Sequence, residues 1–541
     1  MLMRSTVVLL LCGAAAASSG SELRFCLRTD PKTFNPLLVE DESSETVRYL
    51  TAGVLIRLNR YTQELEGELA TKWKVSENGR RIDFDLRPGV RFSDGTPFTC
   101  EDVVYTMRQV MDPELHTPVG DAFRSAPGAV ESRCTGSPGT SAVTVRFPAP
   151  VAALAAQFDQ VAIVSAHSAA KESAVLGSFE LGEYKPGAYV LLRRNPNYWK
   201  RDANGRALPY LDSIRLEIQQ NRELELLRFR RGELDIVNKL DPDMYDRLSA
   251  EMPHAVLDAG PSLDWETVFF NQVDNAPLPE YKRRWFRSED FRRAISEGIR
   301  RDDMVRIVYH GHARAAIGPV SVANRFWLNP ALKPGSGSEA AALALLQHGG
   351  FRRAGSMLVD RDGNKVEFSM ITNAGNKLHE RMLALIQQDL ARLGIQLNVV
   401  TLDFPSLIER ISRTFNYEAV LMAFSNLDLD PSGQMNIWVS SAANHQWNPN
   451  QKTPATPWEA EVDKLMAAQN GTEDRAKRKA YFDRVQQIVV DKAPMLFLVN
   501  PNALSAVSPN VKNVTPAVLT PQIFWNADRL QVGGGTLVSQ K

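Results

Sequence analysis

Apolar and polar residues alternate along several short segments of the chain. Residues 82–87 and 143–147 each place every second side chain on an apolar face, which predicts two half-buried strands. Between them, Thr99 is followed by Asp102 and then by an apolar run, the pattern of a capping box at a helix start. Short elements separated by proline and glycine therefore dominate this half of the chain.

A helix is predicted over residues 221–231, with Leu224, Leu227 and Phe229 facing inward. Gly232 follows at the position where a left-handed residue ends a helix. Residues 234–237 then predict a strand.

The most informative stretch, residues 366–431, predicts an α/β arrangement of strand, helix, strand, helix and strand. The strands cover 366–371, 395–400 and 417–424, and Pro405 opens a helix over 406–413. The longer helix carries its apolar face on Leu378, Met382, Leu385, Ile386, Leu390 and Leu393, and ends at Gly394. Such a chain predicts parallel strands joined by right-handed crossovers.

The loop after the last of these strands, residues 425–431, is a candidate ligand site. Ligands of open α/β sheets bind beyond the carboxyl ends of the strands. A turn whose aspartates bond their own backbone explains the same residues. Both interpretations stay open, although Asp430, directly before Pro431, is expected to be structural in either.

The N-terminus has the order of a secretory signal peptide. Arg4 is followed by the apolar residues 7–11 and by small residues at 14–17, so we expect cleavage near Ala17 and no later than Gly20. Anchoring as a lipoprotein at Cys12 is the alternative, but Leu11 stands where a small residue is preferred. The mature chain is therefore expected in the periplasm.

Length, charge and cysteine content bear on the number of domains, the partners and the disulfides of this chain. A chain of 541 residues exceeds one hydrophobic core, so two or three domains are expected. Basic and acidic residues both number 63, which disfavours a nucleic-acid partner. In an oxidising compartment Cys26, Cys100 and Cys134 can form one internal pair, with Cys100 and Cys134 the nearer two, or remain three buried thiols.

The sequence contains no catalytic or metal-binding motif that indicates an enzyme. The chain has no nucleophile elbow, no P-loop and no dinucleotide fingerprint after a strand. His379-Glu380 begins like a zinc-protease helix, but Leu383 takes the second ligand position, so His379 is expected to be exposed near a helix start. His310-Gly311-His312 could hold a metal, yet without a third ligand we expect solvated histidines. We expect no catalytic residue, no metal and no cofactor.

Several segments together resemble the extracellular solute-binding proteins of dipeptide and oligopeptide ABC importers (periplasmic peptide-binding type, family 5). The most specific is the strand, turn and capped helix over residues 69–103, with Asp94-Gly95-Thr96-Pro97 at the turn. Further similar segments occur in the same order, at residues 179–199, 231–236, 270–271 and 291–295. The resemblance covers essentially the whole mature chain.

The resemblance implies a bilobal periplasmic-binding-protein-like fold of class α/β with an extra subdomain in lobe I. Lobe I would comprise residues 21–266 and 500–541, with the extra subdomain at 60–178, and lobe II residues 267–499. The chain would cross the hinge near Asn271 and near Asn500. The lobes would close on a peptide-like solute, and a membrane permease with its ATPase would receive it. We expect a monomer.

The resemblance also indicates which residues bind the ligand. In one loop, however, this chain departs from the pattern of its peptide-binding relatives. Peptide-binding relatives carry a tryptophan after the lobe II strand and, three residues on, an aspartate that holds the ligand's α-ammonium. Here Phe424 and Leu427 occupy those positions, so either Asp428 acts after a shift of one residue or the ligand has no free amino terminus. Asn271, Asn426 and Trp447 complete the predicted contacts.

Two other functions remain open at this stage. In the first of these functions, the same fold binds a sugar, a metal chelate or a haem-like compound instead of a peptide. The second is an exported chaperone or a signalling partner.

Overall fold

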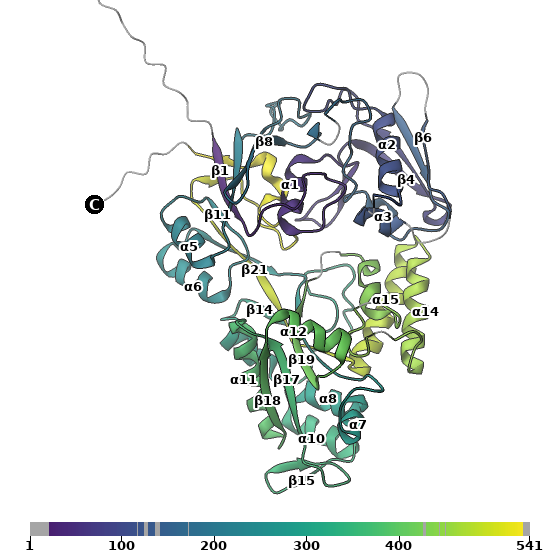
Figure 1. The fold of residues 1–541 in the computed structure, drawn as a ribbon, viewed down its shortest axis with the longest axis vertical. Helices are drawn as coiled ribbons and strands as arrows, with labels where there is room; N and C mark the ends of the chain where they lie inside the picture. Colours follow the sequence, from purple (N-terminus) through teal and green to yellow (C-terminus); the bar gives the residue numbers. More distant parts are fainter. Residues whose placement is uncertain are drawn as a thin grey trace, which may run out of the picture.

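A computed structural model describes residues 21–533 except 116, 124–127, 136–140, 171–172, 426–428, 443 and 450. Figure 1 shows two lobes joined by strand β21 (Val499–Val507), with the C-terminal segment returning to the lobe that begins the chain. This confirms the bilobal α/β fold. The predicted signal peptide lies outside the described residues.

Outside the extra subdomain, the described part of lobe I is built around two sheets. The first has the order β1-β10-β9-β8, with β1 and β10 parallel and the other pairs antiparallel. The second joins β11, β21 and β12, and β14 of lobe II pairs with the other end of β21. The bounds of the elements named here and of the helices of this lobe's core are β1 Glu22–Leu27, β8 Phe179–Lys185, β9 Tyr189–Arg194, β10 Ser213–Ile218, β11 Ile236–Val237, β12 Val256–Pro261, β14 Ala313–Ala315, α1 Glu42–Thr51, α5 Arg222–Arg230 and α6 Pro242–Glu251.

The extra subdomain is an antiparallel sheet of order β4-β5-β7-β6 covered by helices. Thr99 and Asp102 form the predicted capping box at the start of α2, and the buried residues of β5 alternate as predicted. A disulfide joins Cys100 to Cys134 with its Cα atoms 5.5 Å apart, and Cys26 remains a buried free thiol. The bounds are β2 Ile56–Leu58, β3 Leu65–Gly67, β4 Ala70–Ser76, β5 Arg81–Leu86, β6 Glu131–Thr135, β7 Ala142–Arg146, α2 Cys100–Met111, α3 Pro118–Phe123 and α4 Leu154–Gln157.

Lobe II is built on a five-stranded sheet of order β18-β17-β19-β13-β20. β17 is parallel to both β18 and β19, as the sequence predicts, whereas β13 is antiparallel to β19 and β20. The bounds are β13 Trp265–Phe270, β15 Arg352–Ala354, β16 Met357–Val359, β17 Glu367–Asn373, β18 Gln396–Leu402, β19 Ala419–Phe424, β20 Met495–Phe497, α7 Glu280–Arg287, α8 Glu289–Gly298, α9 Arg301–Asp303, α10 Glu339–His348, α11 Lys377–Arg392, α12 Phe404–Glu409, α13 Met435–Trp438, α14 Pro457–Asn470 and α15 Arg475–Lys492.

The chain passes between the lobes at two adjacent segments. Along β21, residues 499–501 pair with β14, and residues 502–507 pair with strands of lobe I. The other crossing precedes β13, because Ser262 still donates its backbone N–H to Pro501 while Trp265 is already paired with Phe424 inside lobe II. This crossing comes a few residues before the Asn271 predicted from the sequence.

Two expectations about buried faces are wrong. Leu224 and Leu227 of α5 are 43% and 39% exposed, while Leu226 and Phe229 are buried. The buried face of the helix is rotated from the predicted one because it includes Glu225, which lies between Arg28 and Arg222. A pattern of apolar residues does not count such a charged position. His379 is buried rather than exposed, because it bonds Glu266 and Thr372 of the central sheet.

Candidate functional site

A cavity of about 620 Å³ lies between the two lobes. We call it the cleft cavity. Lobe I supplies the tip of the β2–β3 hairpin and the α4 region, and lobe II supplies a loop at 324–327, the segment 429–433 and the start of α15. The residues that line it are Leu58, Arg60, Thr62, Gln63, Glu64, Leu65, Ala153, Ala155, Ala156, Gln157, Asp159, Gln160, Asn324, Arg325, Phe326, Trp327, Leu429, Asp430, Gly433, Glu473, Arg475 and Arg478.

The lobe I wall is held by a buried ion pair. Arg60 donates to Asp159 at 2.7 Å, and both side chains are more than 90% buried. Asp159 also accepts the backbone N–H of Leu58, so it fixes the strand from which the hairpin tip extends. Burial alone would raise the pKa of Asp159, but Arg60, the nearby Arg57 and the Leu58 N–H hold it below its ordinary value.

The lobe II wall is held by a second pair. Arg478, buried at the start of α15, donates to both carboxylate oxygens of Asp430 at 2.5 and 2.9 Å. Asp430 also accepts the backbone N–H of Ser432 and so caps the turn that begins at Pro431. Asp430 is structural, as the sequence predicts, and it lines the cavity as well.

Four other charged side chains face the cavity without an ion-pair partner among the described residues: Glu64, Arg325, Glu473 and Arg475. The guanidinium of Arg475 lies 3.7 Å from the ring centroid of Phe326, which orients it without neutralising it. Burial raises the pKa of Glu473. The cavity therefore offers charges of both signs to a ligand, with the two unpaired arginines on lobe II.

A second, smaller cavity of about 270 Å³ lies beside the hinge. Its walls include Ser262 and Asp264 from one crossing, Asn502 from the other, and Ser425 at the end of β19. The loop after β19 thus begins at the hinge cavity with Ser425 and reaches the cleft cavity with Leu429, which lies at the predicted carboxyl edge of the sheet.

Comparison with known proteins identifies this architecture. The sequence profile of the bacterial extracellular solute-binding proteins, family 5 Middle, matches residues 64–446. The chain belongs to this family. Members of the family are binding proteins rather than enzymes, and they act outside the cytoplasm.

Curated relatives match the chain over most of its length. A protein of Deinococcus radiodurans named "Probable ABC transporter-binding protein" is 25% identical over 89% of this chain and 87% of its own. The oligopeptide-binding protein AppA of Bacillus subtilis is 23% identical over the same shares of the two chains.

Solved structures share the fold. NikA from Brucella suis, in complex with Fe(III)-EDTA, aligns with a TM-score of 0.77 at 19% identity, over 94% of this chain and 99% of its own. AppA from Bacillus subtilis, in complex with a nonapeptide, aligns with a TM-score of 0.68 at 21% identity, over 95% and 99%.

Asn271, one of the predicted contacts of this solute-binding protein, lies away from the cleft cavity. It follows the end of β13 that is remote from Phe424, and its side chain is buried. Its amide N–H groups donate to the carbonyls of Phe415 and Tyr417, and its oxygen accepts the N–H of Val273. All of these bonds fix the turn after β13.

Phe424 and Trp447 belong to the aromatic core of lobe II. The Phe424 ring stacks on Trp265 with centroids 4.8 Å apart and planes 11° apart. Trp447 is buried and donates its indole N–H to Glu459. Neither residue lines the cleft cavity or the hinge cavity. Asn426, Leu427 and Asp428 lie outside the described residues.

Of the residues that line the cleft cavity, the sequence pointed only to the end of the loop 425–431, through Leu429 and Asp430. Arg60, Asp159, Arg325 and Arg475 come from four separate segments and belong to no motif. Only their convergence in space marks them.

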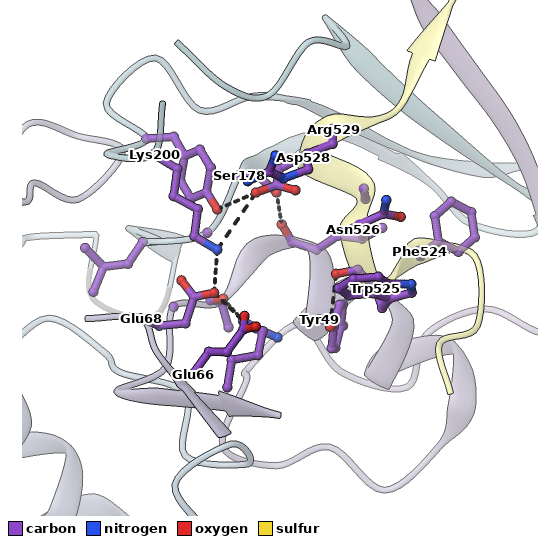
Figure 2. A pocket seen from close by; sticks show the side chains of 18 of the residues that line it. Tyr49, Glu66, Glu68, Ser178, Lys200, Phe524, Trp525, Asn526, Asp528 and Arg529 are labelled. Carbon is purple, nitrogen blue, oxygen red and sulfur yellow. Dashed lines mark hydrogen bonds and ion pairs between the residues drawn. The ribbon is translucent and has the colours of Figure 1, made fainter. Parts of the chain in front are cut away.

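A third cavity, of about 320 Å³, lies within lobe I (Figure 2). Lys200 contacts Glu68 closely and lies 3.9 Å from Asp528, which accepts the Tyr198 hydroxyl at 3.2 Å. Figure 2 shows these groups joined across one side of the cavity. Its inner charges are paired and all of its walls belong to one lobe, so movement of the lobes does not assemble it. The cleft cavity is therefore the better candidate.

Two searches of the described part of the chain are negative. No group of three or more histidine, cysteine, aspartate or glutamate side chains in that part could hold a metal ion. Within the same residues, no helix has the length and apolar character needed to cross a bilayer.

Proposed function

We propose that this solute-binding protein captures a peptide or peptide-like solute between its lobes and delivers it to the permease and ATPase of an ABC importer. The observation that carries the proposal is the cleft cavity, whose walls come from both lobes and carry unpaired charges of both signs. A ligand that contacts both walls stabilises the closed arrangement, since it gains those contacts only there. Binding and release are its whole action, with no catalysis.

The charges of the cavity suit a zwitterion with separated ends. Arg325 and Arg475 together offer a site for a carboxylate, since a guanidinium binds that group with paired N–H donors. Glu64 on lobe I and Glu473 on lobe II offer acceptors for an ammonium group. A short peptide carries both groups, and the relatives include an oligopeptide-binding protein.

The ammonium contact is assigned to the loop after β19. Asp428 is proposed to bind it, because Ser425 and Leu429 on either side line the hinge cavity and the cleft cavity. Asn426 and Leu427 are proposed as neighbouring contacts. If Asp428 has no part, either Glu64 or Glu473 takes the ammonium group or the ligand enters without a free amino terminus.

The compartment and the assembly follow the same proposal. Residues 1–20 act as a cleaved signal peptide that exports the chain to the periplasm, with lipoprotein anchoring at Cys12 the alternative. The protein acts as a monomer, because the cleft is complete within one chain.

The test is direct binding. The purified protein is screened against a library of di- to pentapeptides by thermal shift, and hits are measured by calorimetry. Arg475→Gln is expected to weaken binding of a carboxylate-bearing hit about 2- to 5-fold, the range of a solvent-accessible ion pair. Arg484→Gln is the matched control, because Arg484 lies on the same helix but pairs with Glu461 away from the cavity. If no peptide binds, the peptide assignment is wrong.

A metal chelate is the second candidate, favoured by the same two arginines. A polycarboxylate chelate would engage Arg325 and Arg475 without needing an ammonium acceptor, and NikA was solved with Fe(III)-EDTA. Fe(III)-EDTA and a sugar panel therefore belong in the same screen. Binding of the chelate that survives Asp428→Asn, with no peptide binding, would favour this alternative.

A further inference from the structure

Two histidines of lobe II meet a row of aspartates of lobe I beside the hinge. His310 lies 2.6 Å from Asp246, and His312 lies 2.8 Å from Asp258. Asp246 also lies 3.5 Å from the other nitrogen of His312, so one carboxylate lies against both imidazoles. The sequence suggested solvated histidines here, but their side chains are only 31% and 19% exposed.

The charges are sorted by lobe. The carboxylates belong to lobe I, since Asp243 and Asp246 lie on α6 and Asp258 on β12. The cations belong to lobe II, where Arg381 of α11 binds Asp243 with both N–H groups, at 2.7 and 3.1 Å. Figure 1 shows α6 of lobe I directly above β14 and α11 of lobe II. Each of these ion pairs therefore crosses the gap between the lobes.

The backbone presents both imidazoles to the same carboxylate. His310 has a left-handed φ of 52° and Gly311 a φ of 90°. A left-handed conformation is uncommon for a residue with a side chain. The turn places His310 and His312 on the side that faces α6, and the His312 ring packs at 4.4 Å from Tyr245.

We propose that His310 and His312 form a pH-sensitive clasp that favours the lobe arrangement seen here when the imidazoles are protonated. An imidazole is a cation below a pH of about 6.5 and neutral above it, whereas aspartates stay ionised through that range. The clasp gains two cations opposite three carboxylates at low pH. At high pH the same contacts keep only hydrogen bonds from neutral imidazoles to the carboxylates.

Charged and polar groups of several elements surround the two imidazoles. Hydrogen bonds from Arg381 hold the pKa of Asp243 below its ordinary value, so this carboxylate remains an anion. The groups that face the imidazoles from the elements packed against them are Asp243, Asp246 and Tyr245 of α6, Asp258 of β12 and Asn502 of β21, with Arg381 and Arg247 next to Asp243.

The test measures the distance between the lobes without ligand, so its outcome is independent of the cargo. Donor and acceptor dyes are attached to Leu181→Cys on lobe I and Phe404→Cys on lobe II, both exposed, in a Cys26→Ala background. The ratio of molecules in the lobe arrangement seen here to molecules in other arrangements is expected to fall about 3- to 10-fold from pH 5.5 to pH 8. His310→Asn/His312→Asn should abolish the change, and asparagine tolerates the left-handed backbone at position 310.

Two further variants complete the test. His348→Asn is the matched control, because His348 pairs with Asp290 at 2.8 Å inside lobe II, so it should behave as the native protein. Asp246→Asn removes the shared negative charge without touching the turn and should reduce the pH response. A native protein whose lobe distance does not change with pH, or a double variant that responds like it, would overturn the proposal.

Discussion

Removing the Cys100–Cys134 disulfide should destabilise the extra subdomain and leave the cleft intact. The bond joins the first residue of α2 to the edge strand β6, which pairs only with β7 among the described strands. The two cysteines are 34 residues apart. For a loop of that length the chain-entropy relation gives about 3.8 kcal/mol of stabilisation at 25 °C. The variant Cys100→Ser/Cys134→Ser tests this value.

The assay combines two readouts. Guanidinium unfolding followed by circular dichroism gives the free energy, and hydrogen exchange resolved by peptide shows where protection is lost. Loss is expected in residues 81–146 and not in the lobe II sheet, because the disulfide lies outside the cleft and hinge cavities. Solute affinity should be unchanged.

The free thiol provides the control. Cys26 forms no disulfide, so a Cys26→Ala protein should lose stability on reduction just as the native protein does. A stability loss below about 1 kcal/mol for the double serine variant would refute the loop-entropy argument. Equal loss of protection in lobe II would refute the localisation.

Three other outcomes are expected. Asp159→Asn leaves Arg60 buried without its anion and should cost about 3–5 kcal/mol by chemical denaturation, whereas a loss under 1 kcal/mol would show the pair to be dispensable. Because the pKa of Asp159 is lowered in the fold, its stabilisation is present above the ordinary aspartate pKa of about 3.9 and is lost as the pH falls through the lower folded value. The free energies of unfolding of the native protein and Asp159→Asn, measured by chemical denaturation at a series of pH values, should therefore differ at neutral pH and converge at acid pH. Asn271→Ala leaves two backbone carbonyls without their hydrogen-bond donor and should lower the free energy of unfolding by about 2–4 kcal/mol. Solute affinity of the folded fraction should be unchanged. A selective loss of affinity in calorimetry would show that Asn271 belongs to the binding site.

Local patterns predicted the local structure well. The capping box at Thr99 and the alternation in β5 depend on neighbours within a few residues, and both are confirmed. The parallel strands of residues 366–424 follow from the crossover rule alone. Family resemblance, rather than these patterns, supplied the two lobes.

Features that depend on distant partners were missed. The rotation of α5 is set by Arg28, almost 200 residues earlier in the chain, and burial of His379 is set by Glu266. Arg325 and Arg475 look like any exposed arginine until the fold places both beside the hairpin of lobe I. The role of Asp428 stays a prediction.

The strand β21 runs without a break from one side of the hinge to the other, while its partner β12 has a bulge between Asp258 and Pro261. Asn500 is paired with Arg314 on one side of the hinge, and Asn502 with Pro261 on the other. Losing or gaining one residue there would turn every later side chain to the opposite face of its sheet. The halves can rotate about this strand but cannot slide along it, so evolution can lengthen the surface loops freely while the length of this segment must stay fixed.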